Sequence, residues 1–123
     1  MGYNLIWTEE NIQDVSETYS YQVARDLEKA CKSKEDEIKW IRNMAGLSRR
    51  FQDMISLDDL TVAELRFSSM SAEYRALLVV IPEEKVLVYY DTVPKKGSYQ
   101  EKTLELMRNN SERISETIRK RID

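Results

Sequence analysis

The spacing of apolar residues predicts strands and helices in two distinct blocks of the chain. The short apolar run NLIWT predicts a first strand at about residues 3 to 8, closed by Thr8 as a helix N-cap. From Glu9 the apolar residues recur every three or four positions, through residues 12 to 30 and again through 38 to 55. Ser33, with Asp36 three residues later, predicts the start of a second helix. Residues 9 to 56 therefore predict two helices, joined near residues 32 to 34 and packed as an antiparallel hairpin.

The second half of the chain has the pattern of strands. TVAELRF predicts a strand, SSMSAE a polar connection, and YRALLVVI a strand that ends at Pro82. PEEK predicts a turn, after which KVLVYYDTV predicts a returning strand. LLVVI has no polar alternation, so we expect that strand to be central and covered on both faces. From Tyr99 the helical period resumes and predicts one C-terminal helix, with an apolar stripe from Leu104 to Ile122.

These elements predict an α+β fold with the order β-α-α-β-β-β-α. Because consecutive strands with short connections pair antiparallel, we expect a curled antiparallel sheet. The helical hairpin and the C-terminal helix are expected on one face, leaving the other face or its end free. A length of 123 residues predicts a single domain over residues 1–123.

Charge and composition narrow the location and the partners. The chain has 19 basic and 22 acidic residues, a net charge of -3. Residues 1–60 carry 8 basic and 12 acidic groups (-4), and residues 61–123 carry 11 and 10 (+1). A polyanion site would therefore have to be a local patch. No apolar run approaches the length of a membrane span, the N-terminus does not resemble a signal peptide, and there is one cysteine, so we expect a cytoplasmic protein with no membrane partner.

The absence of histidine restricts the available chemistry. A Ser-His-Asp or Cys-His pair is excluded, and one cysteine without histidine does not predict a zinc site. We therefore expect no metal and no cofactor, with proton transfer left to Lys, Tyr, Asp or Glu. Cys31 is expected to fill a small apolar space. Trp7 and Trp40 are expected in the core or as anchors for a partner, and Arg49–Arg50 as an exposed pair.

Cations at the strand ends are the candidate functional groups. Lys95 and Lys96 directly follow an apolar strand, and Arg75 interrupts another. An arginine fork binds two phosphate oxygens at once, so these side chains suit a phosphate-binding face. The alternative for Arg75 is a position on the solvent face or an ion pair with Glu64 across strands, and the alternative for the lysines is an exposed turn.

The ordered set of motifs in residues 61 to 100 resembles the RelE/ParE superfamily of toxins from toxin–antitoxin pairs. The resemblance rests on a strand with a Leu-Arg step, a Tyr-Arg strand, an acidic turn, an apolar strand, a basic pair and a tyrosine. In this sequence they are Leu65–Arg66, Tyr74–Arg75, Glu84–Lys85, Val86–Tyr90, Lys95–Lys96 and Tyr99. The resemblance implies the RelE-like fold, and it covers the helical hairpin only by architecture.

RelE-like members cut messenger RNA on the ribosome by activating the ribose 2′-hydroxyl, without a metal. The resemblance implies that Arg75 lies at the scissile phosphate and that Lys95 or Lys96 stabilises developing charge. It further implies that Tyr99 orients the substrate or stacks on it, and that Arg66 is the first strand arginine. Val62 and Glu64 stand where the family usually has lysines, so Glu64 or Glu73 is the candidate general base.

Two other functions are compatible with the same resemblance. ParE-like members inhibit a topoisomerase and do not cut RNA, and a degenerate member would only bind a partner. The resemblance implies a cognate antitoxin as partner, together with the ribosome and messenger RNA. The long apolar stripe of the C-terminal helix predicts a groove for the antitoxin or a homodimer contact.

Overall fold

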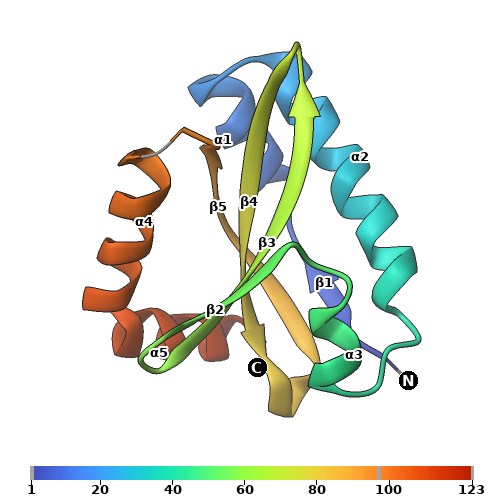
Figure 1. Ribbon diagram of the computed structural model, residues 1–123, viewed down its shortest axis with the longest axis vertical. Coiled ribbons are helices and arrows are strands. Elements are labelled where there is room, and N and C mark those ends of the chain that lie inside the picture. The colour runs from blue at the N-terminus through green and yellow to red at the C-terminus, as the bar shows by residue number, and fades with distance from the viewer. Residues whose placement is uncertain (1, 97, 123) are drawn as a thin grey trace.

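Five helices and one five-stranded open sheet form an α+β fold (Figure 1) in the described part of the chain. The computed structural model describes residues 2–96 and 98–122, without the side chains of Ser98 and Tyr99. In chain order the elements are β1 (Asn4–Ile6), α1 (Glu9–Thr18), α2 (Tyr21–Ile38), α3 (Met44–Ser48), β2 (Asp53–Leu57), β3 (Leu60–Ser69), β4 (Ala72–Ile81), the 3₁₀ turn η1 (Pro82–Glu84), β5 (Val86–Pro94), α4 (Ser98–Asn109) and α5 (Ser111–Ile122).

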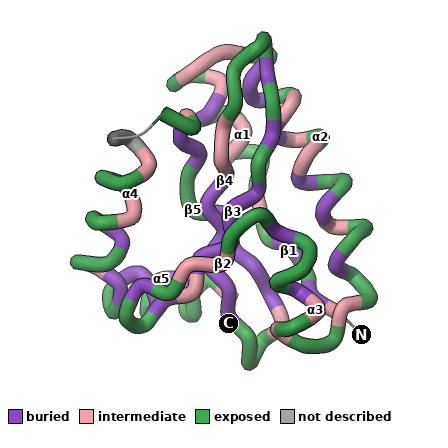
Figure 2. Tube along the Cα trace, viewed as in Figure 1, coloured by how far each residue is buried: buried purple, intermediate pink, exposed green. Residues whose placement is uncertain are grey.

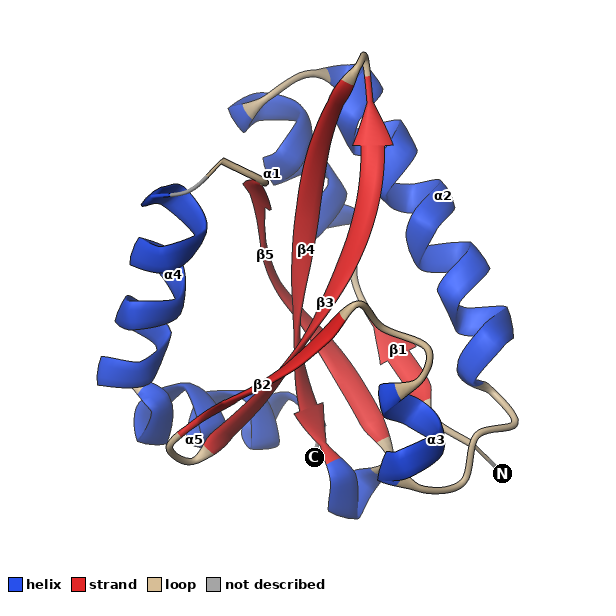
Figure 3. Cartoon of the chain, viewed as in Figure 1, coloured by secondary structure: helices blue, strands red, loops and turns tan. Residues whose placement is uncertain are grey.

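The strand order in the sheet is β1-β5-β4-β3-β2 (Figure 3). The meander β2-β3-β4-β5 is antiparallel throughout, as expected, but β1 pairs parallel with β5. The prediction of a wholly antiparallel sheet was therefore wrong at one edge. The reason is that β1 pairs with the last strand rather than the next one, and such a pair is not joined by a hairpin.

Strand β4 is the middle strand, and residues 76–81 are buried on both faces, which confirms the prediction from LLVVI. Alternate residues enter two separate clusters. Ala76, Leu78 and Val80 pack with α1, α2 and α3, whereas Leu77, Val79 and Ile81 pack with α4 and α5. The two clusters are the two faces of one sheet, because successive strand side chains point to opposite sides.

Helices therefore cover both faces of the sheet, and the prediction of helices on one face was wrong. Met107 of α4 and both Ile114 and Ile118 of α5 are buried in the second cluster. Figure 1 shows α2 on one side of the long β3–β4 hairpin and α4 with α5 on the other. The buried positions follow the middle of the sheet, and the exposed ones follow the outer helix surfaces (Figure 2). A strand with two apolar faces requires cover on both.

The helical hairpin breaks earlier than predicted. Thr8 caps α1 as expected, accepting the backbone N–H of Asn11 at 3.1 Å. The second cap is Ser20, which accepts the backbone N–H of Val23 at 3.2 Å, and not Ser33, which lies inside α2. Residues 53–56, predicted as helix, belong instead to the edge strand β2.

The C-terminal segment is two helices rather than one, separated at Asn110. Its apolar stripe packs on the chain's own sheet, and among the described side chains of α4 the large apolar one that stays exposed is Leu106, at 62 %. The stripe that predicted a partner groove is thus used internally. Across the described residues, every helix is too short or too polar to cross a bilayer.

The β3–β4 connection is tighter than SSMSAE suggested. Ser69 pairs with Ala72, so the turn consists of Met70 and Ser71 alone. Both have positive φ, 51° and 66°. Positive φ at both central residues is the requirement of a type I′ turn, whose backbone twist matches the right-handed twist of the two strands.

Burial of β4 sets the first testable prediction. Leu78 has no exposed surface, so Leu78→Ala should lower the free energy of unfolding by about 2–5 kcal/mol. The matched control is Leu106→Ala on the exposed side of α4, which should change it by less than about 0.5 kcal/mol. Urea denaturation followed by circular dichroism measures both. Equal effects of the two changes would contradict the assignment of β4 to the centre of the sheet.

Candidate functional site

The predicted functional residues of β3 and β4 lie on one face of the sheet. Arg66 pairs with Arg75, Glu64 with Leu77, and Ser68 with Glu73. Directly opposite residues point to the same side, and Leu77 packs with α4 and α5. We call Glu64, Arg66, Ser68, Glu73 and Arg75 the polar face. It continues the α4–α5 side of the sheet towards the tip of the β3–β4 hairpin.

Glu64 and Arg75 form a buried ion pair closed by α4. Arg75 Nη1 donates to Glu64 Oε1 at 3.1 Å and to Gln100 Oε1 at 2.5 Å. The Gln100 amide in turn donates to Glu64 Oε2. The side chain of Glu64 is 0 % exposed and that of Arg75 is 12 % exposed. The pair expected as an alternative role for Arg75 is thus formed, and a residue from a third element seals it.

Burial dominates the proton affinity of Glu64. It raises the pKa of the carboxyl, and the Arg75 guanidinium opposes that rise. Asp53, which stands directly opposite Glu64 in the β2–β3 register, adds to it by like-charge repulsion. A carboxylate with a raised pKa beside an arginine is the kind of group that serves as a general base. In the closed arrangement, however, substrate does not reach it.

Arg75 is also incompletely satisfied. Its Nε is buried and has no hydrogen-bond partner in the described part of the protein. A buried donor without a partner costs about 1–3 kcal/mol. The ion pair with Glu64 therefore does not satisfy the whole Arg75 guanidinium, because the N–H at Nε can still donate to a ligand.

Lys95 and Glu73 form a second, exposed pair at the end of β5. The Lys95 ammonium lies 3.0 Å from Glu73 Oε2, and the backbone N–H of Lys95 donates to the Glu73 carbonyl at 3.0 Å. The hydrogen bond from Lys95 holds the pKa of the Glu73 carboxyl below its ordinary value. Glu73 is thus a surface partner for a lysine and a poor general base, which leaves Glu64 as the better candidate.

Arg66 and Lys96 are the uncommitted cations of the predicted set. Both are exposed, and neither has an ion-pair partner within 4 Å among the described residues. Lys96 lines an open groove of about 560 Å³ together with Tyr74, Pro94 and Lys95. The groove does not include Arg66 or Arg75. The arginines thus meet on the sheet and the lysines meet at the groove, instead of all four surrounding one hollow.

Tyr99 belongs to the first turn of α4, but its side chain lies outside the described residues. Cys31 is fully buried, as expected, and burial raises the pKa of its thiol to about 12, so it is not a nucleophile. Sequence reasoning missed Gln100. Nothing in the local pattern joins a glutamine at a helix start to a glutamate 36 residues earlier.

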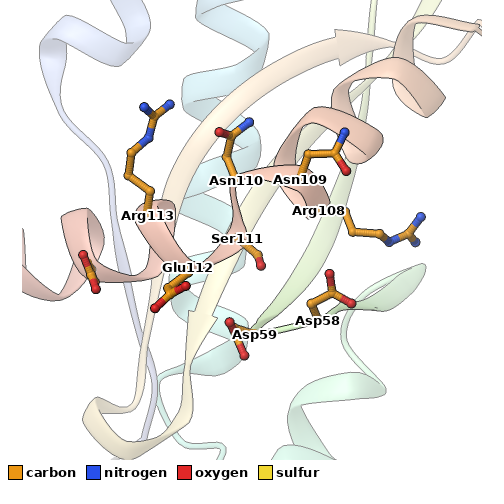
Figure 4. A pocket seen from close by; sticks show the side chains of 9 residues that line it. Asp58, Asp59, Arg108, Asn109, Asn110, Ser111, Glu112 and Arg113 are labelled. Atoms are coloured by element: carbon orange, nitrogen blue, oxygen red, sulfur yellow. The ribbon is translucent and has the colours of Figure 1, made fainter.

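A second polar pocket, of about 590 Å³, lies where the β2–β3 turn faces the α4–α5 junction (Figure 4). Asp58 and Asp59 come from the turn, Arg108 and Asn109 from the end of α4, and Asn110 from the junction. No predicted site residue lines it. Among the described residues, no group of three or more acidic, histidine or cysteine side chains is arranged to hold a metal.

No family model matches the chain, and no curated protein matches it either.

The pKa of Glu64 gives a testable prediction with a definite sign. A folded-state pKa above the ordinary 4.5 means that the folded protein holds this proton more tightly. The stabilising contribution is then present below the unfolded-state pKa and is lost as pH rises through the folded-state pKa. The free energy of unfolding of the wild type minus that of Glu64→Gln should therefore fall as pH rises above the ordinary pKa of 4.5. Urea denaturation measures it, and a difference that grows with pH would show that Arg75, not burial, sets the pKa.

Proposed function

We propose that this protein is a RelE-like toxin that cleaves RNA in the translating ribosome, by 2′-hydroxyl attack on the adjacent phosphate. The proposal is supported by the helical hairpin inserted between β1 and an antiparallel meander, which is the architecture that the resemblance implies. The observation that carries it is a buried carboxylate with a raised pKa, Glu64, beside two arginines of neighbouring strands.

Each step of the reaction has a candidate group. Glu64 takes the proton of the 2′-hydroxyl, whose oxygen then attacks phosphorus. Arg66 and Arg75 bind the phosphate oxygens as negative charge develops, and a guanidinium fork suits that task. Lys95 and Lys96 lie at the separate groove, so water protonates the leaving 5′ oxygen, and the hydroxide that forms takes the proton from Glu64. The products are a 2′,3′-cyclic phosphate and a 5′-hydroxyl, with no metal required.

Access to Glu64 requires a local rearrangement. Gln100 covers the Glu64–Arg75 pair through two hydrogen bonds. A phosphate could replace the glutamine oxygen at Arg75, because Arg75 retains an unsatisfied Nε. The first turn of α4 would then move off the polar face. Tyr99 lies in the same turn of α4 and would move with Gln100. Substrate binding and the opening of the site would then occur together.

The same burial supports a second candidate function, binding without catalysis. A closed ion pair at Glu64 and a paired Lys95 suit a protein that inhibits a topoisomerase, as ParE-like toxins do, or that only binds a partner. The acidic surface of α1, which begins with Glu9 and Glu10, suits contact with protein better than with RNA. In either case a cognate antitoxin is the proposed partner. Self-association through α5 is a further proposal, limited to its outer side.

Messenger cleavage in a translating extract tests the proposal. Glu64→Gln should lower the cleavage rate by about 10²–10⁴-fold, because it removes the base. Arg66→Ala should lower it by about 10²–10³-fold through loss of one charge-stabilising donor. Arg66 is exposed, so its variant should fold normally, which circular dichroism checks. The matched control is Lys102→Ala, an exposed cation of α4 away from the polar face, which should cleave like the wild type.

Two outcomes would contradict the nuclease assignment. The first is intact messenger with the wild-type protein at every concentration. The second is cleavage that survives Glu64→Gln and Arg66→Ala together. DNA-damage signalling on expression, with messengers intact, would select the topoisomerase inhibitor instead.

A further inference from the structure

A strongly basic segment lies far from the polar face in the fold. Residues 39–52, KWIRNMAGLSRRFQ, contain four cations and no acid in a chain with net charge -3. The segment includes α3 and its flanking loops. In Figure 1, α3 lies at the opposite end of the molecule from the tip of the β3–β4 hairpin. The proposed function uses none of these residues.

The apolar residues of this segment fix it to the body of the protein. Leu47 and Phe51 are buried in the first core cluster, and Ile41 and Met44 pack against it. Asn43 caps α3 by accepting the backbone N–H of Gly46 at 2.8 Å. The buried ammonium of Lys34 donates to the Arg50 carbonyl and lies 4.9 Å from the centre of the Phe51 ring. The segment is therefore held in place before any ligand arrives.

Trp40 is the exception to this inward packing. Its side chain is 75 % exposed, although the smaller apolar residues around it are covered. The other tryptophan, Trp7, is half-buried and donates its indole N–H to Glu35. Trp40 is therefore not a core residue, which leaves the predicted role of an anchor for a partner. The segment thus buries Leu47 and Phe51 but exposes its largest ring, with the Lys39 ammonium 6.0 Å from the ring centre, and an exposed ring of this kind is suited to stacking.

The cations of residues 39–52 are available to a ligand. Arg42, Arg49 and Arg50 are exposed, and none has an ion-pair partner among the described residues. Lys39 lies 3.5 Å from Asp36 in an exposed pair of the kind that contributes little. Arg42 precedes α3 and Arg49 follows it, so they flank a short helix and are on the order of 10 Å apart along it. This spacing suits successive groups of an extended polyanion.

We infer that Lys39, Trp40, Arg42, Arg49 and Arg50, here called the Trp40 surface, bind a single-stranded polynucleotide. The arginines would contact successive phosphates and Trp40 would stack on a base, as in other single-strand binding surfaces. A membrane surface fits less well, because it requires a helix with an apolar face to insert. Here α3 has five residues, and its two large apolar side chains, Met44 and Leu47, pack in or against the core.

This inference shares only the ligand class with the proposed function. It concerns binding at another part of the molecule and does not require cleavage. The Arg66→Ala protein should therefore keep the Trp40 surface intact, and in the test it removes the exposed arginine of the polar face.

Fluorescence anisotropy of a labelled oligouridine tests the inference with the full-length Arg66→Ala protein. Trp40→Ala should weaken binding by roughly 5- to 150-fold, as expected for loss of one stacked base. The change of Arg42, Arg49 and Arg50 to Ala should lower the slope of log affinity against log salt by about 2, the value for three single-strand phosphate contacts. The control replaces three exposed cations elsewhere, Lys102, Arg108 and Lys120, by Ala and should retain the slope. Oligothymidine in parallel shows whether RNA is preferred over DNA.

Several results would overturn the inference. One is an equal loss of affinity in the control and in the arginine variant, which would mean that only total charge matters. Another is unchanged affinity in Trp40→Ala and in the arginine variant. Absence of binding to both oligonucleotides would also overturn it. If phosphatidylserine vesicles, but neither oligonucleotide, shift the tryptophan emission to the blue, the surface is a membrane site.

Discussion

The burial of β4 on both faces is the constraint on which the rest of this structure depends. Residues 76–81 supply apolar side chains alternately to two clusters, so two sets of helices are required. The hairpin α1–α2, with α3, covers one face. The chain then has to bring α4 and α5 across to the other face after β5 ends. Without that second layer, Leu77, Val79 and Ile81 would be exposed, and each fully buried side chain of this kind contributes about 1.5–3 kcal/mol.

The same constraint determines the state of the candidate site. The helix that covers Leu77 and its neighbours begins close to the polar face, and it brings Gln100 over Glu64 and Arg75. A buried ion pair gains little stability over apolar packing, whereas breaking it leaves a costly unpaired charge. A pair of apolar side chains in the positions of Glu64 and Arg75 would therefore stabilise the fold at least as well as the ion pair does. The cost of this ion pair is the physical reason for treating the pair as functional and not only as structural.

The sequence predicted those features that local chemistry determines. LLVVI predicted the central strand, and PEEK predicted the turn after it. The ion pair between Glu64 and Arg75 was predicted as the alternative role of Arg75. The sequence did not predict β2, because Met54 and Ile55 also fit the preceding helical stripe, and strand pairing with β3 decides between the two periods. It placed the helix break at Ser33 because two sites have capping chemistry and only tertiary packing selects Ser20. The partnership of Gln100 with Glu64 depends on where α4 lies in space, which no local pattern encodes.

The most direct test of this account is a double-mutant cycle between Glu64 on β3 and Gln100 on α4. The free energies of unfolding of Glu64→Ala, Gln100→Ala and the double variant are measured by urea denaturation. If α4 covers the second face and closes over the ion pair, the two changes should be coupled by about 0.5–3 kcal/mol. Additivity to within about 0.3–0.5 kcal/mol, the behaviour of distant sites, would contradict the placement of α4 on which the account rests.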